Sequence, residues 1–176
     1  CLVKKSGRIF ILSNNHVLAN SNEASPGDPI LQPGPYDGGK YPDDHIANLE
    51  EFVPISFDEQ TSECPLTRGL ASFFNGIARV FGSPDRLKAV RTRAVENKVD
   101  AAIARPLNDR DVSPEILEIG TIQGLVNGEL GMAVKKSGRT TGLTTGEILQ
   151  VDVTVNVQYG AGRIARFSDQ LLAGAM

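Results

Sequence analysis

The stretch Arg8-Ile9-Phe10-Ile11-Leu12-Ser13-Asn14-Asn15-His16 carries most of what the sequence says about its fold. Four consecutive apolar residues, 9–12, predict a strand that is buried on both faces. Ser6-Gly7 supplies turn residues just before it, so residues 1–4 and 8–13 are expected to pair as a hairpin. The apolar run then gives way to polar residues and reaches a histidine at the point where the strand ends.

The composition favours the all-β class. Hydrophobic residues make up 40% of the 176 positions, which is enough for a core, and 18 Gly with 10 Pro predict many short strands joined by tight turns. The net charge of −3 gives no support for nucleic-acid binding. No apolar run reaches the length of a membrane span, so we expect neither a nucleic-acid partner nor a membrane span.

Further strands are expected on both sides of a helical segment. Residues 21–57 are rich in Gly and Pro and should form strands and turns without a long helix. An apolar strand is predicted at 99–106, and 151–157 alternates between valine and polar residues as a strand does.

The helical segment is predicted at about 65–96 as a hairpin of two helices. One helical face is indicated by the spacing of Leu66, Leu70, Phe73, Phe74, Ile77 and Phe81. Ser83 and Pro84 are expected to begin a second helix, with Leu87, Val90 and Ala94 on one side. The apolar face should be covered, by the hairpin itself, its own barrel or a second subunit.

The charge of this segment differs from that of the remaining chain. Residues 65–98 hold seven Lys or Arg and two acids, whereas the other residues hold eleven Lys or Arg and nineteen acids. The basic face around Arg86, Arg91 and Arg93 is therefore expected either to contact an acidic surface or to be solvated.

Two residues are candidates for catalysis. A histidine at the end of a buried strand, as His16 is, can serve as a general base near neutral pH, although it can also simply satisfy a turn hydrogen bond. Asp100 begins the apolar run Val99-Asp100-Ala101-Ala102-Ile103-Ala104, where a carboxylate needs a partner. That partner is either the imidazole of His16 or backbone N–H groups at the strand start.

The motifs around these residues resemble those of trypsin-like serine peptidases, especially the bacterial high-temperature-requirement proteases. Residues 13–17 (Ser-Asn-Asn-His-Val) look like the histidine motif, and 99–104 is similar to the aspartate motif. Residues 138–148, Gly-Arg-Thr-Thr-Gly-Leu-Thr-Thr-Gly-Glu-Ile, look like the hairpin that opens the second barrel. The motifs occur in the family's order. His16 and Asp100 are 84 positions apart, and the helical segment accounts for the excess length.

The resemblance implies two six-stranded antiparallel β-barrels. The first would occupy residues 1–110 with the insert at 65–96, and the second, incomplete, would occupy 111–176. It also implies peptide-bond hydrolysis without a cofactor, with His16 as general base and Asp100 as its orienting partner. The family's nucleophile lies in Gly-Asp-Ser-Gly, which does not occur here, and neither Ser137 nor Ser168 has the flanking glycines. The expected nucleophile therefore lies beyond Met176.

The expected partners are a protein or peptide substrate and a missing C-terminal segment or second subunit that completes the second barrel. Two alternatives stay open: a non-catalytic interaction module on the same fold, and an esterase with the same triad. Localisation also stays open, with secretion or the cell envelope among the alternatives.

Three lesser features do not predict sites. His45 follows Asp44, but adjacent residues of an extended chain point to opposite faces. Acidic side chains that could supply oxygen ligands to calcium lack the spacing of a calcium loop, so we expect them to be solvated; they are Asp37, Asp43, Asp44 and Glu50. Cys1 and Cys64 form no Cys-x-x-Cys pair, which argues against zinc and leaves a disulfide or two free thiols.

Overall fold

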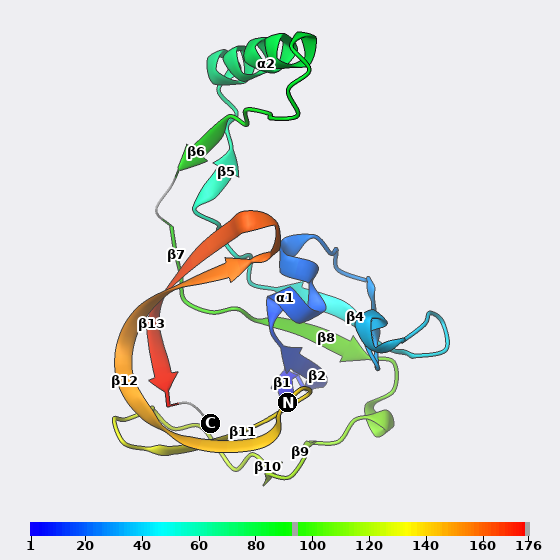
Figure 1. Ribbon diagram of the computed structural model, residues 1–176. Helices are drawn as coiled ribbons and strands as arrows, with labels where there is room; N and C mark the ends of the chain where they lie inside the picture. The colour runs from blue at the N-terminus through cyan, green and yellow to red at the C-terminus, as the bar shows by residue number, and fades with distance from the viewer. Residues whose placement is uncertain (93–94, 175–176) are drawn as a thin grey trace. The chain divides into compact units, whose positions relative to one another are not determined.

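The computed structural model describes residues 1–92 and 95–174, and this part of the chain is built mostly from β-strands (Figure 1). It contains two α-helices, α1 (Asn15–Leu18) and α2 (Pro65–Val80). The strands, with short 3₁₀ turns between some of them, are β1 (Leu2–Lys5), β2 (Arg8–Ser13), β3 (Pro29–Leu31), β4 (His45–Phe52), β5 (Glu59–Thr61), β6 (Val90–Thr92), β7 (Glu96–Asn97), β8 (Ala102–Pro106), β9 (Glu115–Ile116), β10 (Gly120–Thr121), β11 (Ala133–Gly138), β12 (Gly142–Tyr159) and β13 (Arg163–Ala173). The chain is therefore of the all-β class, as expected.

Contacts divide the chain into two compact units. The first unit comprises Cys1–Ile55, Asn97–Val155 and the segment from Phe167 onward. The second comprises Ser56–Glu96 and Asn156–Arg166. No helix in the described part of the chain has the length and apolar character needed to cross a membrane.

The main sheet of the first unit has the order β1-β2-β8-β4-β3, with antiparallel pairing throughout (Figure 1). The predicted hairpin is confirmed as β1 and β2, with Val3 opposite Phe10. Its turn at Ser6 and Gly7 needs positive φ at both residues, +50° and +79°, which explains the value of glycine there.

The core of the first unit lies where α1 meets β4 and β8. Ala19, Ala47 and Ala104 are completely buried there, and Leu49 is almost completely buried. Small alanine side chains let the backbone of the α1 segment approach the strands closely. The helix that carries His16 is therefore fixed by packing at its C-terminal end, where Leu18 is buried.

A second sheet has the strand order β11-β12-β13-β7. In the first unit, β11 and β12 form the hairpin expected from the Gly- and Thr-rich motif, with Val134 opposite Gly146 and Ser137 opposite Leu143. Gly142 follows the turn with a φ of +59°. In both large sheets the first and last strands do not pair with each other, and no closed barrel is seen within residues 1–92 and 95–174.

The second unit contains α2, which confirms the first predicted helix. The predicted second helix after Ser83 is wrong: the chain is extended there, and β6 (Val90–Thr92) pairs with β5. The spacing of Leu87 and Val90 fits a helix, but pairing of the β6 backbone with a strand distant in the sequence outweighs this weak local preference. Ala94, the third residue of that pattern, lies outside the described residues.

The apolar face of α2 is not covered by a second helix, so the self-covering helical hairpin is wrong, while cover by its own barrel or by a second subunit stays a prediction. The side chains of Phe73 and Phe81 are 62% and 83% exposed. The second helix that was expected to cover this face does not form. Phe73 and Phe74 contact each other edge to face, with 5.6 Å between their ring centroids, which shields neither from solvent.

Candidate active site

The pairing of β2 with β8 brings the predicted site residues together. Ser13 of β2 lies opposite Ala102 of β8 in an antiparallel register. Just beyond this pairing, Asn14 Nδ2 donates to the Asp100 carbonyl at 3.2 Å, two positions before His16. Residues 84 positions apart in the sequence therefore become neighbours without any contribution from the helical segment between them.

The short helix α1 fixes the direction of the His16 side chain. Asn14 is extended at the end of β2, and its carbonyl accepts hydrogen bonds from Val17 N and Leu18 N at 3.2 and 3.0 Å. The single turn ends at Ala19, whose N–H donates to Asn15 O at 2.7 Å. Because Leu18 and Ala19 are buried, this turn cannot rotate without disrupting the core.

Asp100 contacts His16 through both of its carboxylate oxygens. Oδ2 lies 2.5 Å from the His16 ring atom Nδ1, and Oδ1 accepts the His16 backbone N–H at 3.2 Å. The predicted hydrogen bond between the two residues is confirmed. Asp100 also accepts a backbone N–H, but this group belongs to His16 in α1 and not to the start of the strand that follows Asp100.

The two side chains differ in exposure in the way a base and its orienting acid would. The His16 side chain is 46% exposed, whereas the Asp100 side chain is 12% exposed. A proton on Nδ1 that is donated to Asp100 leaves Nε2 as the hydrogen-bond acceptor of the ring. The carboxylate is shielded, while the imidazole remains accessible to a reactant.

A network of buried amides holds α1 in place. Asn15 is completely buried, and its Nδ2 donates to Val53 O at 2.7 Å and to Asn22 Oδ1 at 2.8 Å. Asn22 returns a backbone hydrogen bond to Asn15 Oδ1 at 3.1 Å and bonds both backbone groups of Ile55. The residue directly before the candidate base is therefore tied to a segment about forty positions away.

Asn14 adds a link on the Asp100 side. Its Nδ2 donates to the Asp100 carbonyl at 3.2 Å, so the two asparagines before His16 bond to two different segments of the chain. Sequence reasoning assigned neither asparagine a role. Their adjacency to a histidine at a strand end was the available signal, but their partners are backbone groups that no side-chain pattern reveals.

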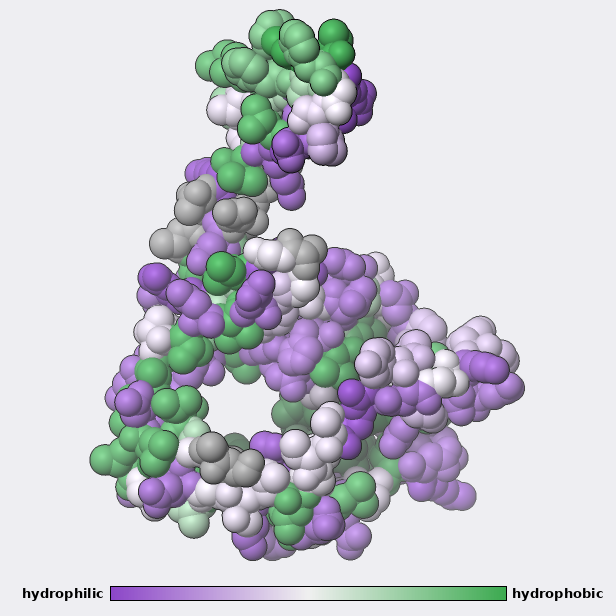
Figure 2. Space-filling view, viewed as in Figure 1, coloured by the Kyte–Doolittle hydropathy of each residue, from purple (hydrophilic) through white to green (hydrophobic). Residues whose placement is uncertain are grey.

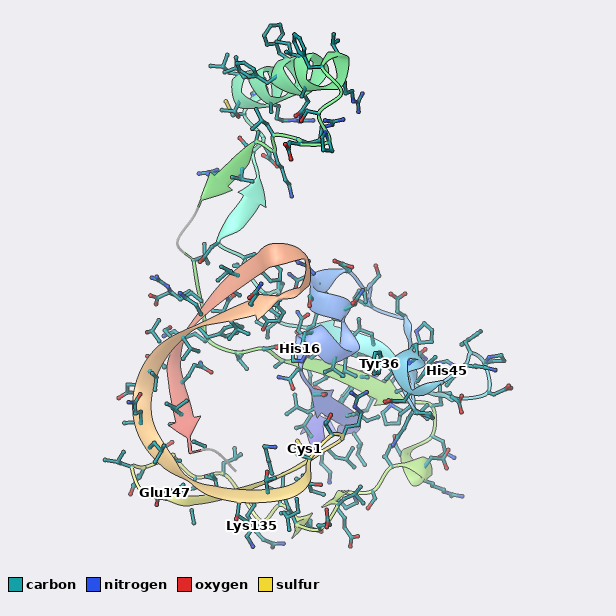
Figure 3. The ribbon with its side chains drawn as sticks, in the orientation of Figure 1. Cys1, His16, Tyr36, His45, Lys135 and Glu147 are labelled. Atoms are coloured by element: carbon teal, nitrogen blue, oxygen red, sulfur yellow. The ribbon has the colours of Figure 1, made fainter. Side chains whose placement is uncertain are left out.

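The second histidine lies at the start of β4, away from α1 (Figure 3). Its Nε2 pairs with Asn48 Oδ1 at 3.0 Å, and its ring lies beside that of Tyr41. Asp44 accepts the backbone N–H of Lys40 at 2.8 Å instead of pairing with its neighbour. The structure thus gives His45 and Asp44 separate local roles.

The remaining serine, acidic and cysteine residues considered from the sequence form no further site in the described part of the chain. Ser168 lies on β13 and is 5% exposed, and Ser137 lies on β11 opposite Leu143. Asp37 pairs with Arg139 at 2.8 Å. Within residues 1–92 and 95–174, no group of three or more His, Cys, Asp or Glu side chains is arranged to hold a metal ion. Both cysteines are exposed free thiols.

The His16 imidazole is thus held by the Asp100 carboxylate, and a sheet and buried amides position both residues. No protein-family model, curated protein or solved structure matches this chain.

Proposed function

We propose that His16 and Asp100 are the general base and its orienting acid in a serine endopeptidase. The observation that carries this proposal is the 2.5 Å contact between His16 Nδ1 and Asp100 Oδ2, combined with the accessible imidazole. A carboxylate in that position selects the tautomer with Nε2 as acceptor and stabilises the imidazolium that forms during proton transfer. No cofactor is required for this chemistry.

In the proposed reaction, His16 Nε2 takes the proton from a serine hydroxyl as the serine oxygen attacks the peptide carbonyl. The imidazolium then returns that proton to the leaving amine as the carbon–nitrogen bond breaks, which leaves an acyl-enzyme. A water molecule, deprotonated by the same nitrogen, hydrolyses the ester and regenerates the serine. Asp100 stays ionised throughout and holds the ring in place.

The proposal locates the nucleophile outside these 176 residues, because Gly-Asp-Ser-Gly does not occur in them. It further treats the five-stranded sheet as part of a first barrel and the β11–β12 hairpin as the opening of a second. The order of histidine, aspartate and hairpin along the chain supports this arrangement. Further chain or a second subunit would then complete the second barrel.

A serine-directed fluorophosphonate tests the proposal without knowledge of the substrate. The protein is produced from its complete reading frame and reacted with the probe, and the labelled residue is identified by mass spectrometry. The His16→Ala variant should react about two to four orders of magnitude more slowly, because the general base is lost. His45→Ala is the matched control, since His45 is the other histidine of these 176 residues, and it should react at the wild-type rate.

The labelled position decides the outcome. Labelling of a serine outside the 176 residues that depends on His16 is the expected result. Labelling that His16→Ala leaves unchanged, or labelling of Ser137 or Ser168, contradicts the assignment. Failure of the folded wild-type protein to react at all favours the non-catalytic interaction module instead.

A further inference from the structure

The second unit uses the polar face of α2, and not its apolar face, to hold the returning chain. Asn75 Nδ2 donates to Leu87 O at 2.8 Å, and Leu87 N donates back to Asn75 Oδ1 at 2.7 Å. Asn75 lies on the side of the helix opposite Phe74 and Ile77 at 3.6 residues per turn. The returning chain therefore contacts the polar side of α2 and leaves the apolar side chains uncovered.

The β5–β6 arm reinforces this arrangement. Gln60 lies opposite Arg91 in the arm, and Ser62 N donates to Ala89 O at 2.9 Å. These contacts join the two ends of the segment that contains α2. Neither the arm nor the Asn75 contact covers the other face of α2, whose apolar side chains are exposed.

That face is a continuous apolar stripe. It consists of Leu66, Leu70, Phe73, Phe74, Ile77, Val80 and Phe81, each between 39% and 84% exposed, and is called the α2 stripe below. Figure 2 shows apolar side chains gathered over α2. Every member carries a hydrocarbon side chain, so the stripe offers no hydrogen-bonding group that would select a particular protein surface.

The charged residues of α2 and of the chain that follows it are mostly positive. Residues 65–92 contain five cations and a single acid, Asp85. The cations are Arg68, Arg79, Arg86, Lys88 and Arg91, and all five are exposed. A helix with Phe and Leu on one face and cations on the other, too short to span a bilayer, is suited to lie in the interface of an anionic membrane.

We propose that α2 binds an anionic lipid surface, with the α2 stripe inserted among the acyl chains and the cations facing the headgroups. At 1.5 Å per residue, its 16 residues extend about 24 Å along the surface. Self-association through the stripe would cover its apolar side chains but leave the cations on the opposite face without counter-charges, whereas anionic lipid supplies both an apolar phase and negative charge. This proposal is independent of the peptidase assignment.

The chain offers a clean reporter, because it contains no tryptophan. The protein carrying Phe73→Trp is mixed with vesicles of phosphatidylcholine and phosphatidylglycerol in equal amounts. Insertion of the stripe should shift the tryptophan emission to shorter wavelength. Pure phosphatidylcholine vesicles, or added salt, should weaken the response, because the electrostatic attraction is lost or screened.

The double substitution Phe74→Gln/Ile77→Gln in the reporter background should weaken binding by more than about tenfold, because it removes apolar area without changing charge. Ser72→Gln is the matched control on the opposite side of the same helix, and it should bind as the reporter does. Arg68→Gln/Arg79→Gln should reduce binding to anionic vesicles only. Far-ultraviolet circular dichroism confirms that each variant keeps its fold.

Three results would overturn the lipid proposal. The first is an emission spectrum that no vesicle changes. The second is emission that is already blue-shifted in buffer for a monomer, which would show that the rest of the chain covers the stripe. The third is a dimer in sedimentation velocity that the double substitution dissociates, which would assign the stripe to a second copy.

Discussion

Asp100 holds His16 at two points, with Oδ2 2.5 Å from the ring atom Nδ1 and Oδ1 accepting the backbone N–H of the same residue at 3.2 Å. The ring contact selects the tautomer, and the backbone contact fixes the turn from which the ring projects. One carboxylate thereby contacts both the ring and the backbone of the candidate base.

Replacing Asp100 with Asn should slow fluorophosphonate labelling by about two to four orders of magnitude. An amide can donate to Nδ1 and so stabilise the wrong tautomer, and it cannot stabilise an imidazolium by charge. The rate is measured under pseudo-first-order conditions on the complete protein. Asp44→Asn removes the same charge beside the other histidine, and it should leave the rate unchanged.

Replacing Asn15 with Ala should lower the free energy of unfolding by about 3 kcal/mol, because a completely buried side chain loses its three hydrogen bonds to Asn22 and Val53. Urea denaturation followed by circular dichroism measures the change. Asn156→Ala is the control, because Asn156 is exposed on β12, and it should alter stability by less than about 0.5 kcal/mol. Equal losses in the two variants would show that the Asn15 network contributes little.

Replacing Ser168 with Ala should leave stability unchanged or raise it by up to about 1 kcal/mol. The Ser168 hydroxyl is buried and lacks a hydrogen-bond partner in the part of the chain that the structure describes, so its removal relieves a desolvation cost.

Ser62→Ala is the matched control for this prediction. Ser62 is also buried, but its hydroxyl bonds Thr67 Oγ1 at 3.0 Å and accepts Cys64 N–H at 3.2 Å. Its loss should therefore destabilise by about 1–2 kcal/mol in the same urea titration. A Ser168 variant that loses as much as the Ser62 variant would show that its hydroxyl is bonded.

Cys64 should be alkylated at a lower pH than an ordinary thiol. Hydrogen bonds from the Thr67 backbone and side chain, and from the Leu66 backbone, lower the pKa of the Cys64 thiol because they stabilise the thiolate. The rate of iodoacetamide modification at Cys64, followed by mass spectrometry against pH, should therefore have its midpoint below the ordinary thiol value. In urea the midpoint should rise, since the helix start that supplies the donors is lost. A midpoint that unfolding leaves unchanged contradicts the assignment.

The sequence was sufficient to predict features that depend on near neighbours. The β1–β2 hairpin follows from an apolar run next to Ser6-Gly7, and α2 follows from a strong helical period. The contact between His16 and Asp100 could also be anticipated, although it spans 84 positions, because the order of the two motifs resembles that of trypsin-like peptidases and a carboxylate at the head of an apolar strand needs a partner.

Features that depend on distant backbone groups could not be predicted. The Asn15 network ends on the carbonyls of Val53 and Ile55, and no periodicity in the sequence marks them. The chain after Ser83 was expected to be helical. The β5–β6 pairing and the hydrogen bonds between Asn75 and Leu87 hold it in an extended conformation instead. These long-range contacts replace the second helix that was expected to cover the α2 stripe, which is therefore exposed.

The central claim is that His16 and Asp100 act as one unit. A double-mutant cycle of fluorophosphonate labelling rates on the complete protein tests it, with His16→Ala, Asp100→Asn and the double variant compared with the wild type. Because Asp100 acts only through His16, the double variant should react no more slowly than His16→Ala alone. Rate losses of the two single variants that multiply in the double variant would contradict the claim, since each residue would then act without the other.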